Sequence, residues 1–165
     1  MASEPDITAV RISILLWAKV IFQLKRRGKS KRESGVFLLG PQDSGAGIVT
    51  SFSCYDDLDP NAYLSGAISF HAIGYAALWK HCREKNLQVL ADVHTHPSHY
   101  VSQSSIDQRN PMIPVKGHTA MIVPNFARTG WWSLSAVGVY EYLGDFKWRI
   151  HGASQKPRRV TLVLW

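Results

Sequence analysis

An apolar strand pattern that runs straight into two histidines is the strongest constraint on the fold of this chain. Residues 87–93 (Leu-Gln-Val-Leu-Ala-Asp-Val) lead directly into His94-Thr95-His96-Pro97. Side chains alternate between the two faces of a strand, so His94 and His96 project from one side, with Cα atoms roughly 6–7 Å apart. Pro97 ends the strand because it has no N–H to donate to a ladder. A buried strand that delivers two imidazoles to one point predicts a metal site at its end.

A serine and an aspartate follow this strand. Ser104 and Asp107 are three residues apart, which places both side chains on one face of a helical turn. We expect a short helix that begins near Ser104 and aims both side chains back at the histidines. Two histidines and one carboxylate leave a fourth position for water, as in a catalytic zinc site. The alternatives are that Ser104 is only a helix N-cap and that Asp107 is only a charge at a helix N-terminus.

A hydrolytic zinc site also needs a base that takes a proton from water and delivers it to the leaving amine. The chain has four glutamates, Glu4, Glu33, Glu84 and Glu141. Glu33 comes just before a buried strand pattern at 36–39, whereas Glu4 lies in the N-terminal tail and Glu84 in the exposed last turn of an expected helix. Glu33 is therefore the best candidate for the base. The alternative is a surface glutamate in a basic loop.

These residues carry a resemblance to a known family. Glu33 followed by His94-x-His96-x7-Ser104-x2-Asp107 resembles the JAMM (MPN+) signature of zinc isopeptidases at every position. The segments at 33–40 and 117–124 are similar to the strands before and after that motif. The resemblance covers roughly residues 10–150 and implies a cytidine-deaminase-like α/β sandwich of the JAB/MPN type, in which helices flank a mixed β-sheet.

The resemblance also implies a role for each residue of the motif. It implies one zinc ion per chain, held by His94, His96 and Asp107. Glu33 becomes the general acid and base, and Ser104 becomes a hydrogen-bond donor to the oxyanion of the tetrahedral intermediate. Asp92 shares the strand face of the two histidines and is expected either to accept a proton from one imidazole or to be a carboxylate at the solvent or core edge.

The implied reaction is hydrolysis of a peptide or isopeptide bond after the C-terminus of a ubiquitin-like protein. The small size of the chain looks like the stand-alone bacterial JAB proteins. Those proteins accompany ubiquitin-like proteins with activating and conjugating enzymes, often in antiphage defence operons, or process sulfur-carrier proteins. We therefore expect the partner to be a ubiquitin-like protein or its conjugate. A RadC-like protein is another branch, but its glycine-rich continuation is replaced here by Ser98-His-Tyr-Val.

The charge of the chain raises a competing function. The formal net charge is +7, and much of it is concentrated in the run Lys25–Arg32. Such a run can contact nucleic acid or an acidic protein partner, or it can be a solvated loop. Aromatic residues are not interleaved with it, which disfavours a base-stacking platform. A non-enzymatic nucleic-acid-binding module remains the alternative, whereas a zinc deaminase is excluded because the Pro-Cys-x-x-Cys that it needs is absent.

Length and composition set the remaining expectations. The 165 residues, of which 45% are hydrophobic and 19% charged, predict one soluble domain over 1–165 with a frayed tail at 1–8. No apolar run reaches the roughly 20 residues of a membrane span, so we expect a cytoplasmic protein. Cys54 and Cys82 are expected to be buried, reduced thiols.

Hydrophobic periodicity predicts the elements. We expect helices over 15–28 and 62–85, the second being the longest, and a loop at 56–60. We expect strands over 36–39, 48–55, 87–93, 119–123, 133–142, 146–150 and 160–164. Residues 10–13 are either a strand or the start of the first helix. His99 and His118 are expected to have structural roles, and the turn residues Trp131 and Trp132 either contact a partner or fill the core.

Overall fold

The computed structural model describes residues 9–43 and 45–165. The expected frayed tail at 1–8, which includes Glu4, lies outside the described residues.

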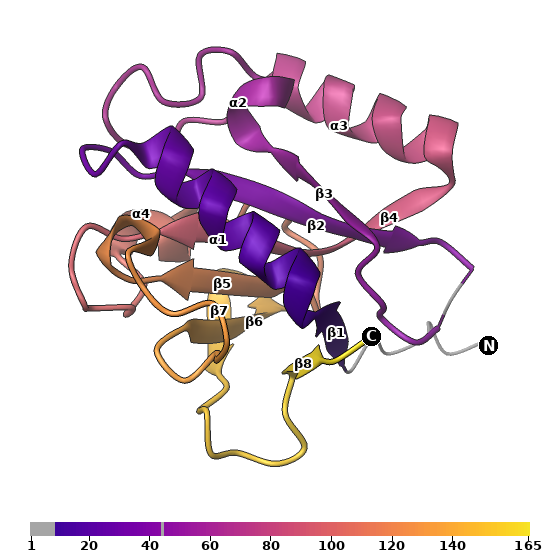
Figure 1. The fold of residues 1–165 in the computed structure, drawn as a ribbon. Coiled ribbons are helices and arrows are strands. Elements are labelled where there is room, and N and C mark those ends of the chain that lie inside the picture. The colour runs from indigo at the N-terminus through magenta and orange to yellow at the C-terminus, as the bar shows by residue number, and fades with distance from the viewer. Residues whose placement is uncertain (1–8, 44) are drawn as a thin grey trace.

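A mixed six-stranded sheet forms the centre of the molecule (Figure 1), in the strand order β3-β2-β4-β5-β6-β7. Within this sheet β4 and β5 pair in parallel, and the other neighbours pair antiparallel. Its strands are β2 (Gly35–Pro41), β3 (Ser51–Cys54), β4 (Leu87–Thr95), β5 (Thr119–Val123), β6 (Gly138–Gly144) and β7 (Lys147–Ile150). A second, two-stranded parallel sheet pairs β1 (Val10–Ser13) with β8 (Val160–Val163).

Helices cover both faces of the central sheet. The described residues form the helices α1 (Ile14–Gly28), α2 (Tyr55–Leu58), α3 (Ala72–Lys85) and α4 (Ser105–Arg109), and a 3₁₀ turn, η1, spans Asn125–Ala127. Trp17 and Leu24 of α1 pack on Val36 and Val93, whereas Leu78 of α3 belongs to the opposite core with Phe37 and Leu39. Alternate residues of β2 thus serve the two cores, as strand geometry requires. The predicted α/β class, with a mixed sheet flanked by helices, is confirmed.

The first helix forms where its periodicity predicts it. The Ser13 hydroxyl accepts a hydrogen bond from the Leu16 N–H at 3.2 Å, which caps the N-terminus. Buried residues then recur with helical spacing at Trp17, Val20 and Leu24. The helix ends at Gly28, and the following Lys29 is left-handed, as a residue after a helix often is. Residues 10–13, left open between strand and helix, form the strand β1.

The expected long helix over 62–85 is wrong in its first half. Helix α3 begins only at Ala72 and has 14 residues, fewer than the 15 of α1. The carboxylate of Asp59 is the reason, because it accepts hydrogen bonds from the backbone N–H and the ring Nδ1 of His71 at 2.8 and 2.7 Å. Gly66 is left-handed, with φ +81°, which interrupts a right-handed helix. The preceding segment is a chain of turns.

Three shorter expectations also need correction. The strand expected over 48–55 is shorter, because only Ser51–Cys54 forms β3, and the loop expected at 56–60 begins instead as the helix α2. Two acidic residues in the first turn of α2, Asp56 and Asp57, complement the helix dipole, and both accept from Arg27 of α1. The strand expected from residue 133 begins at Gly138.

Replacing Asp59 by Ala is expected to destabilise the protein by about 2–4 kcal/mol, because three hydrogen bonds to this buried carboxylate are lost. Besides the two donors of His71, the Asn61 N–H donates to Asp59 at 3.0 Å. Burial raises the pKa of Asp59, but the hydrogen bonds from His71 outweigh it and the net pKa is lowered. This stabilisation is therefore present above the ordinary pKa of 3.8 and is lost as the pH falls through the folded value.

Urea unfolding at neutral pH measures this effect. Asp57→Ala is the matched control, because Asp57 is exposed and Arg27 keeps its second partner, Asp56. Equal stability of the two variants would contradict a structural role for Asp59.

Cys54 and Cys82 are both buried and free, as expected. In the described part of the chain, no helix combines the length and the apolar character that crossing a membrane requires.

Candidate metal centre

The candidate site lies where β4 ends. His94 is the last residue but one of β4, opposite Gly35 of β2 and next to Ile122 of β5. His96 follows the strand, and its N–H donates to the Val123 carbonyl at 2.9 Å. Both histidines are at least nine-tenths buried, with exposed fractions of 8% and 9%. The central position of β4, with a strand on each side, fixes the backbone of both residues.

Side-chain atoms of three residues meet at this point. The Nε2 atoms of His94 and His96 are 3.2 Å apart. Asp107 of α4 lies 3.2 Å from His96 through Oδ2 and 3.4 Å from His94 through Oδ1. Zinc bonds of about 2.0–2.1 Å at tetrahedral angles separate neighbouring ligand atoms by roughly 3.3–3.4 Å. These closest separations are those of neighbouring ligands on one zinc ion, so the three residues, called here the donor triangle, can hold a metal ion.

The ring orientation of His96 agrees with metal binding. Its Nδ1 lies 3.1 Å from the Tyr100 carbonyl, which can only accept, so the neutral ring carries its proton on Nδ1. The lone pair of Nε2 then points toward His94 and the Asp107 carboxylate. Facing acceptors of this kind need a cation between them, and metal-bound histidines are commonly held by such a backbone carbonyl.

Electrostatics at the site favour a cation in the same place. Burial raises the pKa of Asp107, but hydrogen bonds to His94 and His96 outweigh it and hold that pKa well below its usual range. The hydrogen bond to Asp107 raises the pKa of His96, against the opposing effect of burial. The Asp107 carboxylate is thus ionised, and its negative charge favours a cation at this point.

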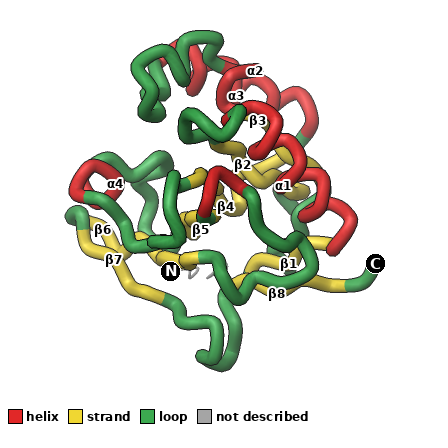
Figure 2. Tube along the Cα trace, turned by 60° about the vertical axis from the view of Figure 1, so that its left-hand side comes forward, coloured by secondary structure: helices red, strands yellow, loops and turns green. Residues whose placement is uncertain are grey.

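Helix α4 presents Asp107 through its N-terminal cap. The predicted short helix is present, with Ser104 as its N-cap. Ser104 Oγ accepts from the Asp107 N–H at 3.1 Å, and its hydroxyl and backbone N–H both donate to Asp107 Oδ2, at 2.8 and 2.7 Å. In Figure 2, α4 lies apart from α1, α2 and α3. The cap therefore fixes the carboxylate that faces the histidines.

Glu33 lies beside the same strand end. Its neighbour Ser34 makes two hydrogen bonds to Thr95: Ser34 N–H donates to Thr95 Oγ1, and Thr95 N–H donates to the Ser34 carbonyl, each at 3.0 Å. Glu33 is half-buried. Burial raises its pKa, while the charges of His94 and His96 act in the opposite direction. A carboxyl group with a raised pKa is suited to exchanging protons near neutral pH.

Two tyrosines, Tyr55 and Tyr63, contact Gly35, the strand residue opposite His94. The Tyr63 hydroxyl accepts from the Gly35 N–H at 3.0 Å and donates to the Gly35 carbonyl at 3.2 Å. The ring of Tyr55 lies so close to Gly35 that a Cβ there would be 2.2 Å from a ring carbon. Only glycine fits at this position. Sequence reasoning missed Tyr63, although a tyrosine within a polar loop was visible, because its partner is 28 residues away.

The other candidate residues lie outside the donor triangle. Asp92 is buried, and its Oδ1 lies 2.6 Å from Nε2 of His118. Asp92 thus pairs with His118. It neither accepts from His94 or His96 nor lies at the solvent edge, so both expectations for Asp92 were wrong. His99 is exposed. Trp131 and Trp132 are 44% and 68% exposed, so they do not fill the core.

A left-handed turn also holds the site and was not foreseen. Asn125, Phe126 and Ala127 of η1 all have positive φ, between 50° and 62°, a conformation that costs roughly 1–2 kcal/mol per residue. The Phe126 N–H donates to the His96 carbonyl and the Asn125 N–H to the Ser98 carbonyl, each at 2.9 Å. The strained turn therefore fixes the backbone on both sides of Pro97.

The fold and the donor triangle together define an α/β protein with a candidate site for one metal ion. No protein-family model matches the chain. The structure is similar to the solution structure of a protein from Desulfitobacterium hafniense, with a TM-score of 0.62 and 14% sequence identity over 94% of each chain.

Two further solved structures are similar. A protein from Salinibacter ruber has a TM-score of 0.58 and 18% identity, over 91% of this chain and 94% of that one. A JAB1/MPN domain protein from Archaeoglobus fulgidus has a TM-score of 0.48 and 17% identity, over 93% of this chain and 99% of that one. At such identities the first two likenesses concern the fold alone.

Proposed function

We propose that this chain is a JAMM-type zinc metallopeptidase that hydrolyses the bond after the C-terminus of a ubiquitin-like protein. The observation that carries the proposal is the triangle of His94, His96 and Asp107, whose donor atoms are 3.2–3.4 Å apart. Glu33 stands beside this triangle at the end of the neighbouring strand. Three ligands and a carboxyl group for proton transfer are what a hydrolytic zinc site needs.

Different backbone and side-chain contacts hold the three ligands in place. His94 is held by strand pairing on both sides, His96 by backbone hydrogen bonds with Val123 and Phe126, and Asp107 by its hydrogen bonds with Ser104. When bound, zinc supplies Lewis acidity to water and to the carbonyl of the scissile bond. The protein contributes the fixed directions of the donor atoms and the low polarity of the buried histidine environment.

Glu33 carries the proton. Its ionised carboxylate takes a proton from the attacking water, and the carboxylic acid then delivers that proton to the leaving amine. Both steps are within its capacity because burial raises the pKa of Glu33 toward the working range. The hydrogen bonds between Ser34 and Thr95 keep Glu33 next to the histidines throughout.

Ser104 stabilises the oxyanion in this proposal. Its hydroxyl is exposed and donates to Asp107 Oδ2 at 2.8 Å. A hydroxyl rotates freely about its C–O bond, so the same proton can be redirected to a developing negative charge on the substrate. The Ser104 N–H keeps Asp107 in place during that rotation, because it donates to the same oxygen.

The substrate class in this proposal comes from the resemblance of the motif. The resemblance supports a ubiquitin-like protein as substrate, either in a conjugate or as a precursor. It also supports a place in a bacterial conjugation or antiviral defence system, with activating and conjugating enzymes as associated proteins.

Zinc analysis and chelation test the proposal. We expect about one zinc ion per purified chain. Removal of the metal with 1,10-phenanthroline should abolish cleavage of a ubiquitin-like protein fused through its C-terminus to a reporter, and added zinc should restore it. A ubiquitin-like protein found among the neighbouring genes is the fusion partner to use. Full activity of zinc-free protein, or no cleavage by zinc-loaded protein, would refute the proposal.

A further inference from the structure

The end of α1 and the turn after it carry a group of basic side chains, called here the basic rim. Lys25, Arg26, Lys29 and Lys31 are all exposed. Within residues 9–43 and 45–165, none of the four has an acidic partner within salt-bridge distance. The two other basic residues of this run are engaged: Arg27 pairs with Asp56 and Asp57, and Arg32 lies over the Tyr63 ring at 5.1 Å.

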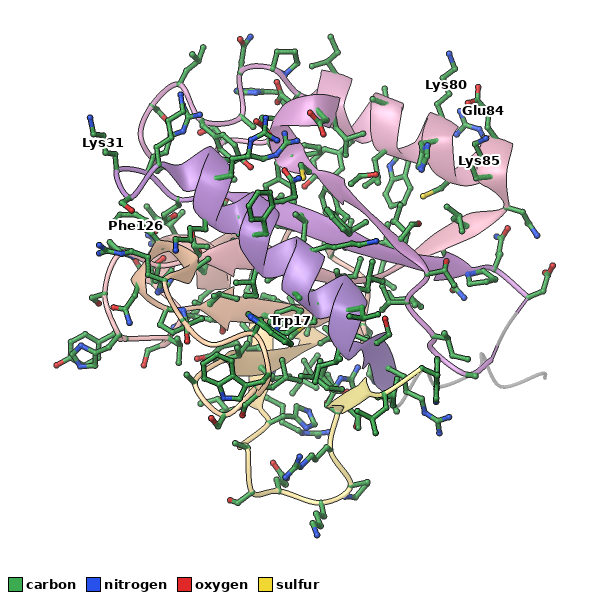
Figure 3. The ribbon with its side chains drawn as sticks, in the orientation of Figure 1. Trp17, Lys31, Lys80, Glu84, Lys85 and Phe126 are labelled. Carbon is green, nitrogen blue, oxygen red and sulfur yellow. The ribbon has the colours of Figure 1, made fainter. Side chains whose placement is uncertain are left out.

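The basic rim lies next to the candidate metal centre. Lys31 is three residues before Ser34, which is hydrogen-bonded to Thr95 between the two histidines. Three residues of chain span at most about 11 Å, so the backbone of Lys31 lies within that distance of Ser34 and closer still to Glu33. Figure 3 shows Lys31 at the edge of the molecule, pointing outward into solvent. A protein substrate at the metal centre is larger than this span and therefore reaches the basic rim.

The turn that carries the basic rim is fixed. The N–H groups of Lys31 and Arg32 donate to the Gly28 carbonyl at 3.0 and 3.1 Å. Ser34 Oγ donates to the Leu24 carbonyl at 2.7 Å, which ties the end of the turn to α1. The charges are therefore presented from a defined position and are not spread over a loose loop.

The helix dipole accounts for only part of the basic rim. Basic residues in the last turn of a helix stabilise its C-terminus by a few tenths to about 1 kcal/mol, which explains Lys25 and Arg26. Lys29 and Lys31 lie beyond the helix end. Elsewhere, acidic side chains form ion pairs within the protein, as Glu141 does with His151, Arg149 and Arg159. The rim is thus a local excess of positive charge.

We propose that the protein cleaved at the metal centre presents a cluster of Asp and Glu side chains beside the scissile bond, and that the basic rim binds this cluster. This inference rests on the proposed function and adds a surface property to its substrate. Opposite charges at the rim of an interface raise the association rate and orient the partner. The expected effect is a preference for acidic substrates that weakens as salt is added.

The geometry favours a protein over a nucleic acid at the basic rim. Arginine forks bind phosphate in two-point fashion, but two of the three arginines of the run are already engaged, Arg27 by two carboxylates and Arg32 by a tyrosine ring. The charges that remain are mainly lysine side chains, without an aromatic platform for bases within the run 25–32.

Two branched substrates test the inference. Both carry the same ubiquitin-like protein, joined by an isopeptide bond to a lysine in a peptide whose flanking residues are either Asp and Glu or Asn and Gln. At about 50 mM salt, kcat/KM should be on the order of tenfold higher for the acidic peptide, and the ratio should approach one at about 500 mM salt. Lys29→Glu combined with Lys31→Glu should reverse the preference.

Lys85→Glu combined with Lys147→Glu is the matched control, because it makes the same change of net charge at two exposed lysines away from the rim. Lys85 lies at the opposite end of the molecule from Lys31 in Figure 3. This control should keep the preference for the acidic peptide. Thermal unfolding of both double variants checks that they fold, and Lys31→Glu alone is the second variant if Lys29→Glu disturbs the helix end.

The outcomes separate the two proposals. Zinc-dependent cleavage of both substrates at equal rates, at every salt concentration, overturns the basic rim and leaves the peptidase intact. Absence of cleavage overturns the peptidase. In that case a binding measurement tests whether the basic rim recognises acidic side chains. It compares the fluorescein-labelled acidic peptide with a DNA oligonucleotide of equal length, each added to zinc-loaded Glu33→Gln protein. Peptide binding that is lost in the Lys29→Glu, Lys31→Glu background supports the rim, and tighter binding of DNA overturns it.

Discussion

Glu33→Gln is expected to lower kcat by about 10²–10⁴-fold while the protein keeps its zinc, because the amide cannot accept a proton from water. The substitution preserves the shape of the side chain, and Glu33 is half-buried two residues before β2 begins at Gly35. Zinc content, measured by mass spectrometry, should stay at about one ion per chain. Loss of activity with retention of metal would separate proton transfer from metal binding.

Glu84→Gln is the matched control for this prediction. Glu84 is exposed near the end of α3, where its contact with Lys80 is long, at 3.9 Å. The same chemical change there should leave kcat and KM as they are. Glu33→Gln protein that cleaves at the wild-type rate would remove Glu33 from the mechanism and leave the base unidentified.

His96→Ala is expected to abolish zinc binding and activity together. Only two ligands, His94 and Asp107, remain after this change. The Asp107 carboxylate also loses one of the two histidine hydrogen bonds that lower its pKa most. Zinc that binds only the folded state stabilises it by about 2.7 kcal/mol at a free concentration one hundred times its Kd. Added zinc should therefore raise the melting temperature of the wild type and leave that of His96→Ala unchanged.

His99→Ala provides the comparison for the histidine variant. His99 is exposed three residues further along the chain and contacts the ring of Tyr100. Its loss should change neither zinc content nor the thermal response to zinc. If His96→Ala still bound zinc stoichiometrically, the donor triangle would be the wrong ligand set.

The sequence predicted the part of the site that follows from local periodicity. An apolar strand pattern placed His94 and His96 on one strand end, and a three-residue spacing placed Ser104 and Asp107 on one helical turn. Both features depend only on the geometry of a strand or a helix. The short helix at Ser104 and the strand into His94 are confirmed, whereas the catalytic roles of these residues stay predictions.

Periodicity failed where a distant side chain decided the local structure. Residues 62–71 carry a helical pattern, but the carboxylate of Asp59 captures the N–H of His71 and begins the helix there. The Tyr63 hydroxyl closes the edge of β2 at Gly35, a contact across 28 residues. The spacing of apolar residues predicts neither the donors that Asp59 binds nor the partner of the Tyr63 hydroxyl. Each contact depends on which segments the fold brings together.

The five-residue helix α4 has a consequence for how a metal would exchange. None of its residues is buried, whereas His94 and His96 belong to the interior of the sheet. Local opening takes place at the segments with the fewest buried contacts. A brief fraying of α4 would carry Asp107 away and leave two ligands on an intact scaffold. The lifetime of a bound ion would then be set by the opening rate of one helical turn, and the histidines would remain preassembled for the next ion.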